Sequence, residues 1–483
     1  MWVGVSRIRH LLPRGGQYAP GQIAATPREH FVSDNRQELR ARAEADGIEF
    51  FLAMFVDMHG KPCAKLVPMA SFDLLMDGGA GFAGFAAGPM GQDPSDPDMS
   101  AVPDTDSYTV VPWEKGVAVL MCDIHVNGEP WNFSPRVILK RELAKLAERG
   151  ITMMAGFEAE YSLLRRTENG GIAIADQLDS ASAPCYDAKA LSRSLPFLQT
   201  TSRYMNQLGW TNYANDHEDA NGQFEQNWKY ADALTSADRL IFFRYMVHVL
   251  AQREGKLATF MPKPFSNLTG NGLHIHTSLW QGDKQLFAAE GDDPHGLGLS
   301  PMAYSYIAGI LDHARAAVAI TCPIVNSYKR MGVGAPDSGA TWAPAYISYG
   351  GNNRTQMLRI PEPGRVEHRG TDGAANPYLA LVAILASGMD GIDRNLAPGP
   401  PNTENLYAMS PVELAKRGIF SVPGTLMHAT EELAKDDVLR AAFGPVRNGS
   451  HYLDYFIKTK QDEFRAYHAV VSDWEINRYL TLF

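Results

Sequence analysis

The chain has 483 residues, of which 45% are hydrophobic and 20% charged, and its formal net charge is −10 at pH 7. This length and composition are typical of a folded protein with one or two domains, and they exclude a disordered or fibrous chain. Nucleic acid is not an expected partner, because the charge is acidic and no block of lysines or arginines occurs. No apolar run approaches the roughly 20 residues that cross a bilayer, so a membrane is not expected either.

The four cysteines are far apart and form no Cys-x-x-Cys pair. This spacing argues against a disulfide framework or a structural zinc site, and we expect reduced thiols in the cytoplasm. Residues 1–28 contain arginines but no acidic residue, and glycines and prolines interrupt them. We therefore expect residues 1–30 to form a loose N-terminal extension, with a transit peptide as the less favoured alternative.

The first part of the chain is expected to be rich in short strands. Apolar runs bounded by turn residues predict strands at residues 49–57, 62–67, 107–111 and 116–123. We predict that residues 31–133 form a small, sheet-dominated domain.

The remainder, residues 134–483, is predicted to be a larger domain of mixed α and β structure. Ser134 followed by Pro135 is typical of a helix start, and apolar residues at helical spacing continue until Gly150. Further elements are predicted in chain order: a strand at 151–164, a helix at 236–253 and a loop at 390–410. The predicted fold class is therefore α+β.

Two acidic clusters have spacings that suit divalent cations. In the predicted strand, Glu158 and Glu160 face the same side, about 7 Å apart, while the residues between them face the core. The stretch 216–225 contains a glycine turn that could bring Glu218 beside Glu225. Carboxylates are ligands that Mg²⁺ and Mn²⁺ prefer. A solvated strand face and an acidic surface loop are the alternative interpretations.

A histidine strand follows a glycine-rich turn at Gly270. Strand alternation places His274, His276 and Ser278 on one face, so one histidine could bind a metal and the next could contact a phosphate. Two satisfied structural histidines are the alternative.

An arginine-rich region follows the histidine strand. Its members are Arg330, Arg354, Arg359, Arg365 and Arg369. Planar guanidinium groups bind carboxylate and phosphate with paired hydrogen bonds, so this density predicts an anionic substrate and a transferred phosphoryl group. Strand parity would place Arg354 and Arg359 on opposite faces, so one must lie in a turn if both reach one site. Surface solubility is the alternative reason for these arginines.

Together and in this order, the motifs resemble the glutamine synthetase family over nearly the whole chain from residue 49 to 483. The resembling segments are 55–60, 158–160, 218–225, 261–278, 326–330 and 375–378. The resemblance implies a β-grasp N-terminal domain and a larger catalytic α/β domain whose sheet forms a funnel. It also implies two stacked hexameric rings, with active sites between neighbouring subunits.

The resemblance implies a role for each matching position. It implies six metal ligands: Glu158, Glu160, Glu218, Glu225, His274 and Glu367. It implies substrate contacts from Tyr186, Gly270, Arg330 and Arg369. It implies nucleotide or phosphate contacts from His276, Ser278, Arg354 and Arg359. Asp57 matches the residue that deprotonates the incoming ammonium, and it would be catalytic together with Arg330 and Arg354.

The implied reaction uses ATP and two or more Mg²⁺ or Mn²⁺ ions per site. The side-chain carboxylate of glutamate attacks the γ-phosphate of ATP, and a small amine then attacks the resulting acyl phosphate. Ammonia-using members carry a glutamate in the flap where this chain has Trp342, and an indole suits an alkylammonium better than a bare ammonium ion. This difference, and the amino-acid sequences of residues 216–225, 338–344 and 472–479, resemble the branch of the family that ligates glutamate with methylamine.

Two alternatives remain open. In an ammonia-dependent glutamine synthetase, Asp337 could replace the missing flap glutamate. An inactive relative that serves in assembly or binding is disfavoured, because all six implied metal ligands are present. Tyr407 lies in a segment that resembles a loop modified with AMP in some members, and we assign it no role.

Overall fold

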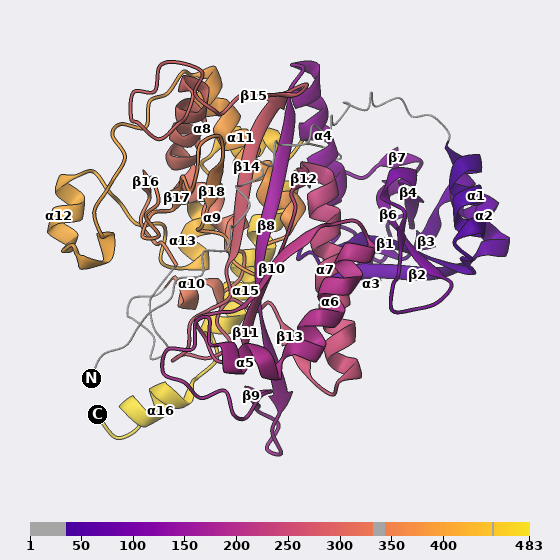
Figure 1. The fold of residues 1–483 in the computed structure, drawn as a ribbon, viewed down its shortest axis with the longest axis horizontal. Coiled ribbons are helices and arrows are strands. Elements are labelled where there is room, and N and C mark those ends of the chain that lie inside the picture. The colour runs from indigo at the N-terminus through magenta and orange to yellow at the C-terminus, as the bar shows by residue number, and fades with distance from the viewer. Residues whose placement is uncertain (1–34, 332–342, 447–448) are drawn as a thin grey trace, which may run out of the picture.

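The computed structural model describes residues 35–331, 343–446 and 449–483 (Figure 1). Two β-sheets organise this part of the chain, one from residues before 131 and one from residues after 151. The expected extension at residues 1–30 lies outside the described residues. None of the described helices is long and apolar enough to cross a membrane.

The smaller sheet has seven strands in the order β2-β1-β6-β4-β3, with β5 and β7 attached to β6. β1 runs parallel to β6, whereas β2 and β4 pair antiparallel with their neighbours. Phe51 of β1 packs against Phe72 of the adjacent helix α2, with ring centroids 5.7 Å apart. The strands are β1 (Phe50–Val56), β2 (Pro62–Pro68), β3 (Ala80–Phe82), β4 (Met99–Pro103), β5 (Thr109–Val110), β6 (Val117–Val126) and β7 (Glu129–Pro130).

The larger sheet has eleven strands, and its main path is β10-β11-β8-β14-β18-β17-β16. The long strand β8 lies between β11 and β14 and pairs antiparallel with both. The strands are β8 (Thr152–Arg166), β9 (Ile172–Ile174), β10 (Asn212–His217), β11 (Gln223–Trp228), β12 (Ala231–Asp232), β13 (Leu257–Thr259), β14 (Leu273–Gln281), β15 (Lys284–Gln285), β16 (Tyr349–Gly350), β17 (Leu358–Arg359) and β18 (Val366–His368).

Helices pack against the larger sheet and against one another, with α7 on β8 and α8 against α11. Helix α4 contacts strands of both sheets and lies between them in Figure 1. The helices are α1 (Arg36–Ala45), α2 (Phe72–Gly78), α3 (Gly84–Ala87), α4 (Pro135–Glu148), α5 (Ala188–Arg193), α6 (Leu195–Gln207), α7 (Ala233–Arg253), α8 (Pro301–Asp312), α9 (Ala314–Thr321), α10 (Ser327–Arg330), α11 (Pro377–Asp393), α12 (Pro411–Lys416), α13 (Leu426–Leu433), α14 (Asp437–Ala442), α15 (Tyr452–His468) and α16 (Asp473–Tyr479).

Most predicted elements are present, with shifts at their ends. The helix expected at 236–253 begins at Ala233, because the side chain of Asp232 accepts a hydrogen bond from the backbone N–H of Thr235 and caps the helix. The strand expected at 107–111 is reduced to Thr109–Val110. The loop expected at 390–410 starts later, since α11 continues to Asp393. The domain boundary at residue 133 falls between the two sheets and stays a prediction.

A buried ionic network joins the smaller sheet to the helices of the larger part. Arg136 of α4 is almost fully buried, and its guanidinium pairs with Asp104 at 2.9 Å, Asp123 at 2.7 Å and Asp238 at 3.0 Å. Burial would raise the pKa of Asp104, but Arg136 and Lys140 hold it at about 2. The network therefore fixes the smaller sheet against α4 and α7.

Replacing Arg136 with methionine should destabilise the fold, because three partly buried carboxylates would lose their shared cation. We expect the free energy of unfolding to fall by about 3–5 kcal/mol, measured from urea midpoints at neutral pH. Because folding depresses the pKa of Asp104, this residue stabilises the fold at pH values above the ordinary pKa of an aspartate. That stability is lost as the pH falls towards about 2. The variant should therefore lose less stability than the wild type over that acidic range.

The control is Arg149→Met, which removes a surface pair with Asp393 and should cost less than about 1 kcal/mol. Equal effects of the two substitutions would contradict a structural role for the buried network.

Candidate active site

A cavity of about 1090 Å³ is lined by residues from the larger sheet and the loops around it. Many of the predicted site residues line it: Glu158, Glu160, Tyr186, Glu218, Glu225, Gly270, His274, His276, Arg330, Arg354, Arg359 and Arg369. Glu367 joins them through ion pairs with Arg359 and Arg369. Residues separated by as many as 211 positions in the sequence, from Glu158 to Arg369, thus face one space.

The register of the larger sheet explains this convergence. Glu160 on β8 pairs with Glu225 on β11, and Glu158 on β8 pairs with His274 on β14. One strand further, His276 pairs with Glu367 on β18. Residues directly opposite each other on neighbouring strands have Cβ atoms about 5 Å apart, so the three pairings form one patch of polar side chains.

Contacts with Asp179 hold the acidic hairpin between β10 and β11 in place. The imidazole Nε2 of buried His217 lies 2.7 Å from Asp179, whose same carboxylate oxygen accepts the backbone N–H of Gly222 at 2.6 Å. Gly222 has φ +69°, a conformation that favours glycine and turns the chain back towards Glu225. The hairpin thereby brings Glu218 and Glu225 to the same edge of the cavity.

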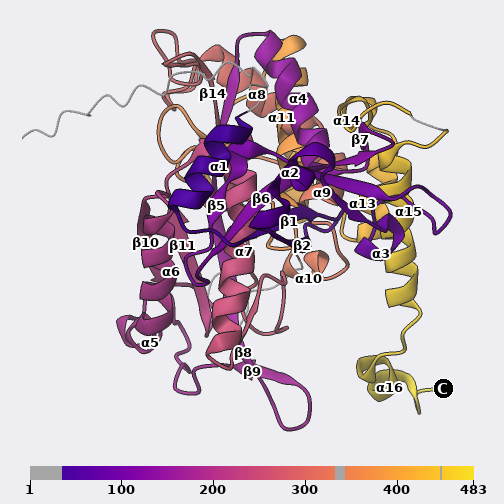
Figure 2. The same cartoon turned by 90° about the vertical axis from the view of Figure 1, so that its right-hand side faces the viewer.

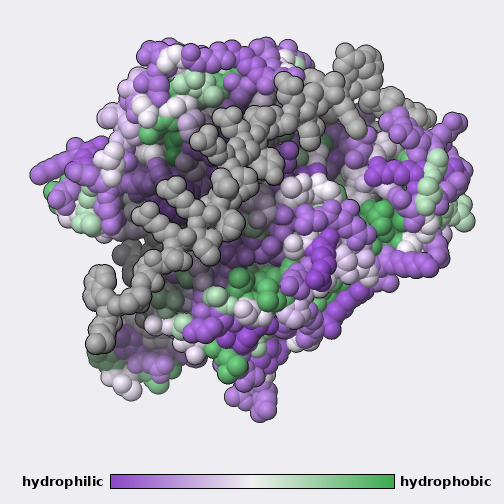
Figure 3. All heavy atoms as spheres, in the orientation of Figure 1, coloured by the Kyte–Doolittle hydropathy of each residue, from purple (hydrophilic) through white to green (hydrophobic). Residues whose placement is uncertain are grey.

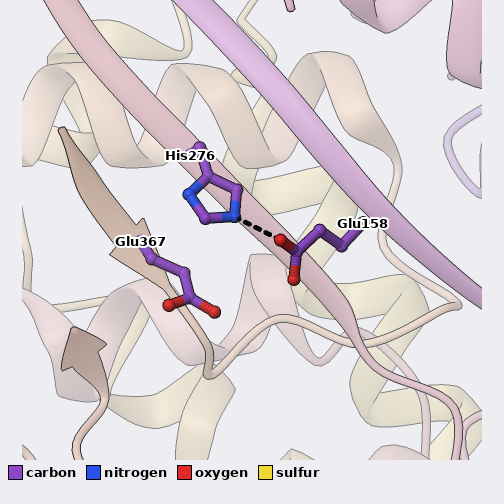
Figure 4. Close-up of side chains that lie close together, drawn as sticks. All are labelled: Glu158, His276 and Glu367. Atoms are coloured by element: carbon purple, nitrogen blue, oxygen red, sulfur yellow. Dashed lines mark hydrogen bonds and ion pairs between the residues drawn. The ribbon is translucent and has the colours of Figure 1, made fainter. Parts of the chain in front are cut away.

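At this cavity, three groups of side chains have donor atoms close enough to hold a cation, with all the donor atoms of each group within 4.8 Å of one another. They are Glu158 with His276 and Glu367, Glu158 with Glu225 and His274, and Asp216 with Glu218 and Glu225. Figure 4 shows the first group, in which Nε2 of His276 lies 2.9 Å from Glu158. These carboxylate and imidazole donors suit Mg²⁺ or Mn²⁺.

The arrangement differs in three details from the roles that the resemblance implied. His276, assigned to the nucleotide side, lies among the candidate cation donors, and Asp216 is an additional acid. Glu160 instead accepts hydrogen bonds from the backbone N–H of Gly272 at 2.7 Å and from Gln223 at 2.9 Å.

Crowding of carboxylates raises several pKa values at the site. Burial, followed by the charges of neighbouring acids, raises the pKa values of Glu218 and Glu225 well above their ordinary range. Burial raises the pKa of Asp216 to about 6. Burial would also raise the pKa of Glu158, but hydrogen bonds from His274 and His276 hold it well below its ordinary value. A bound divalent cation would relieve the repulsion among these acids.

The arginines provide positive charge on the same cavity, and Arg330 and Arg369 are buried there. Arg359 and Arg369 each donate to one oxygen of Glu367, at 2.7 Å and 2.6 Å. Nη1 of Arg330 and Nε of Arg369 are buried without a hydrogen-bond partner among the described residues. Buried donors are rarely left unsatisfied, so these two nitrogens indicate an anionic ligand. Arg354 lies in a turn and Arg359 in β17, as strand parity requires.

Two of the predicted site residues that the structure describes lie away from the cavity. Asp57 lies in the loop after β1, is buried, and does not line it. Ser278 is also absent from the lining, and its hydroxyl accepts a hydrogen bond from the indole of Trp280 at 2.9 Å. Trp342 and the alternative Asp337 lie outside the described residues.

Other lining residues had no assigned role in the sequence: Cys185, Tyr213, Asp216, Lys263 and Lys329. Asp216, Lys263 and Lys329 occur in motifs noted there, and the strand register, which pairs Asp216 with Glu225, could have singled out Asp216. Tyr213 is exposed and stands in no motif that predicts a ligand.

Divalent metal should stabilise the protein in a pH-dependent manner. Since the pKa values of Glu218 and Glu225 are raised on folding, the metal-free fold loses stability as the pH rises through those values. Metal requires the ionised carboxylates, so we expect Mn²⁺ to raise the unfolding temperature more at about pH 7.5 than at about pH 5.5. A ligand at 100 times its dissociation constant adds about 2.7 kcal/mol.

Scanning calorimetry with Mn²⁺ and with a chelator provides the measurement. Glu225→Gln should lose most of the metal response, whereas Glu290→Gln, at an exposed pair with Lys284, should retain it. An equal response at both pH values would contradict the assignment of these acids as ligands.

Comparisons with known proteins agree with this geometry. Residues 132–479 match the family model described as "Glutamine synthetase, catalytic domain". The chain is 47% identical to a glutamate–methylamine ligase of Methyloversatilis universalis, over 90% of this chain and 97% of that protein. It is 41% identical to a glutamine synthetase of Rhizobium leguminosarum bv. phaseoli, over 91% and 98% of the two chains.

A solved structure described as "GmaS/ADP complex-Conformation 1" has the same fold. It superposes with a TM-score of 0.85 at 44% sequence identity and covers 92% of this chain and 99% of that one. The predicted α+β fold class is therefore confirmed.

Proposed function

Because this chain belongs to the glutamine synthetase family and is an ATP-dependent ligase, we propose that it joins L-glutamate to methylamine and forms γ-glutamylmethylamide through γ-glutamyl phosphate. The observation that supports ligase chemistry best is the convergence of acids, imidazoles and unsatisfied arginine nitrogens on one cavity. The choice of methylamine is supported by the similarity to the Methyloversatilis protein and by Trp342 in the flap.

The acidic side of the cavity is where we expect two or more Mg²⁺ or Mn²⁺ ions. Their ligands would be Glu158, Glu160, Glu218, Glu225, His274 and Glu367, with Asp216 and His276 close enough to contribute. When bound, such ions neutralise the triphosphate and stabilise the charge that develops during phosphoryl transfer.

The basic side of the cavity would bind the anionic substrates. We assign Arg330, Arg369 and the backbone at Gly270 to glutamate, since the two guanidinium groups are buried there with unsatisfied nitrogens. We assign Arg354 and Arg359 to the phosphates, and His276 with Ser278 to the nucleotide side. The guanidinium groups would orient the glutamate carboxylate for attack and stabilise the transferred phosphoryl group.

The amine would be bound by the exposed Tyr186 and by Trp342, and Asp57 would accept its proton. Because Asp57 does not line the cavity of its own chain, we propose that it serves the cavity of a neighbouring copy in stacked hexameric rings. Helix α16 supports assembly, since it stands apart from the body in Figure 2 and exposes Trp474, with Leu480 and Phe483 exposed in the residues that follow it. Figure 3 shows further apolar patches on a mostly polar face.

The free thiols of all four cysteines support the predicted cytoplasmic location. An ammonia-dependent glutamine synthetase, with Asp337 in place of the flap glutamate, is the second candidate function. The similarity to the Rhizobium enzyme favours it. An inactive assembly protein is disfavoured by the complete set of candidate ligands.

The amine can be identified by a panel assay. ADP release should be measured with methylamine, ethylamine, putrescine and ammonium at matched concentrations of the free base. We expect kcat/KM to be about 10- to 200-fold higher for methylamine than for ammonia, because discrimination by one methylene is worth about 1–3 kcal/mol. A clear preference for ammonium would refute the methylamine proposal and leave the ligase class intact.

The flap residue provides an independent test of amine choice. Trp342→Glu replaces an apolar, cation-π surface with a carboxylate and should move the methylamine-to-ammonia ratio of kcat/KM towards ammonia by about tenfold. Trp342→Phe is the matched control, since it keeps an aromatic face and should largely keep the ratio. If the glutamate variant leaves the ratio unchanged, Trp342 does not select the amine.

A further inference from the structure

A buried lysine lies outside the cavity and has no role in the chemistry proposed above. Lys460 of α15 is 1% exposed, although lysine is almost never fully buried without a partner. Its Nζ lies 3.1 Å from Nδ1 of His59 and 3.1 Å from a carboxylate oxygen of Glu463. Lys460 therefore connects α15 to the turn that follows β1.

That turn carries Asp57. One oxygen of the Asp57 carboxylate accepts the backbone N–H groups of His59 at 2.9 Å and Lys61 at 3.0 Å. The side-chain amide of Asn376, at the start of α11, donates to the backbone oxygens of Asp57 and Met58 at 3.1 and 3.2 Å. The turn is thus held on one side by α11 and on the other by Lys460.

The contact between Lys460 and His59 suits a donating lysine. Burial, and then the charge of Lys460, lower the pKa of His59, which favours the neutral imidazole, and in the tautomer with its hydrogen on Nε2 the Nδ1 atom accepts from the lysine. Burial lowers the pKa of Lys460, whereas Glu463 raises it. Removing the lysine would leave Nδ1 of His59 without its donor, and the turn would lose one of the contacts that hold it.

We propose that Lys460 is a positioning residue for Asp57: through His59, it holds the 57–61 turn so that the carboxylate is presented to the cavity of a neighbouring copy. This inference rests on the proposed function, because Asp57 matters there as the acceptor of the proton from the amine. Lys460 makes no hydrogen bond to Asp57 among the described residues and acts on it by holding the turn and by the proximity of its charge.

Glu463 is a less selective probe than Lys460. Its other carboxylate oxygen accepts the backbone N–H of Val325 at 3.1 Å, and the next residue, Asn326, exchanges hydrogen bonds with Lys263 of the chain's own cavity. A change at Glu463 would disturb two cavities at once, whereas Lys460 and His59 report on the Asp57 turn.

The first test separates the amine step from the steps before it. Lys460→Met should lower amine-dependent kcat/KM roughly 10- to 100-fold, as expected for a misplaced catalytic group. The KM values for glutamate and ATP, and the slow glutamate-dependent ADP release without amine, should stay within about twofold, since the chain's own cavity is intact. His59→Leu should behave similarly, and His59→Asn, which keeps an acceptor near the position of Nδ1, should restore most of the activity.

The matched control is Lys458→Met on the same helix, where the lysine side chain is 76% exposed and pairs with Asp462. It should leave all of these constants unchanged. If Lys460→Met lowers the release of ADP without amine as much as the amine-dependent rate, Lys460 supports the fold in general and the proposal is wrong.

The second test uses hybrid assemblies of two variants that are each strongly impaired on their own. Lys460→Met chains have an intact cavity, and Glu367→Gln chains have an intact Asp57 turn. If the turn acts on a neighbouring copy, equal co-expression should restore about a quarter of the wild-type sites. A complete site then needs a Lys460→Met chain, which supplies the intact cavity, next to a Glu367→Gln chain, which supplies the intact turn. Mixed assemblies without recovered activity would overturn the proposal.

The amine in these assays is the one that the wild type uses best. If the wild type prefers ammonium, the proposal of methylamine ligation is refuted. The test of Lys460 then uses ammonium as the amine and remains valid.

Discussion

Repulsion among buried carboxylates is the constraint on which the candidate active site depends. Glu158, Glu160, Glu218 and Glu225 lie within one cavity, and burial makes each negative charge costly. The protein compensates part of this charge with His274 and hydrogen-bonded loops and leaves part uncompensated, as the raised pKa values of Glu218 and Glu225 indicate. A site that is unfavourable when empty and favourable when filled is suited to hold cations tightly.

The sheet is built so that this repulsion cannot be relieved by movement. β8 has a neighbouring strand on each side, and each acid sits opposite a residue that belongs to the same cluster. Behind the sheet, Phe157, Ala159 and Tyr161 are buried among apolar side chains, which prevents the strand from rotating. The cost of concentrating charge is therefore offset by the packing of the opposite face.

The sequence predicted much of this arrangement because strand alternation and helix capping are local properties. Glu158 and Glu160 face the cavity with Phe157 and Ala159 opposite, as alternation requires, and α4 begins at Pro135. Placement of Asp216 beside Glu225 depends on cross-strand register, which one sequence does not encode visibly.

Other features depend on contacts between distant segments. Strand alternation places Ser278 on the same face as His274 and His276, but its hydroxyl accepts a hydrogen bond from Trp280. No sequence motif predicts this hydrogen bond. The turn at Asp57 resembles its family motif, yet its support comes from α11 and from a lysine about 400 residues away. Roles that depend on such long-range contacts, or on another copy of the chain, were recoverable only through resemblance.

The pairing of β8 also limits how this chain can change its length. Loss or gain of one residue within the strand would turn both glutamates into the hydrophobic layer and expose the aromatic residues instead. Insertions and deletions should therefore accumulate in connecting segments, while β8, β11 and β14 keep a constant number of residues. Among homologous chains, spacing within these three strands would be a more sensitive sign of a working site than overall similarity.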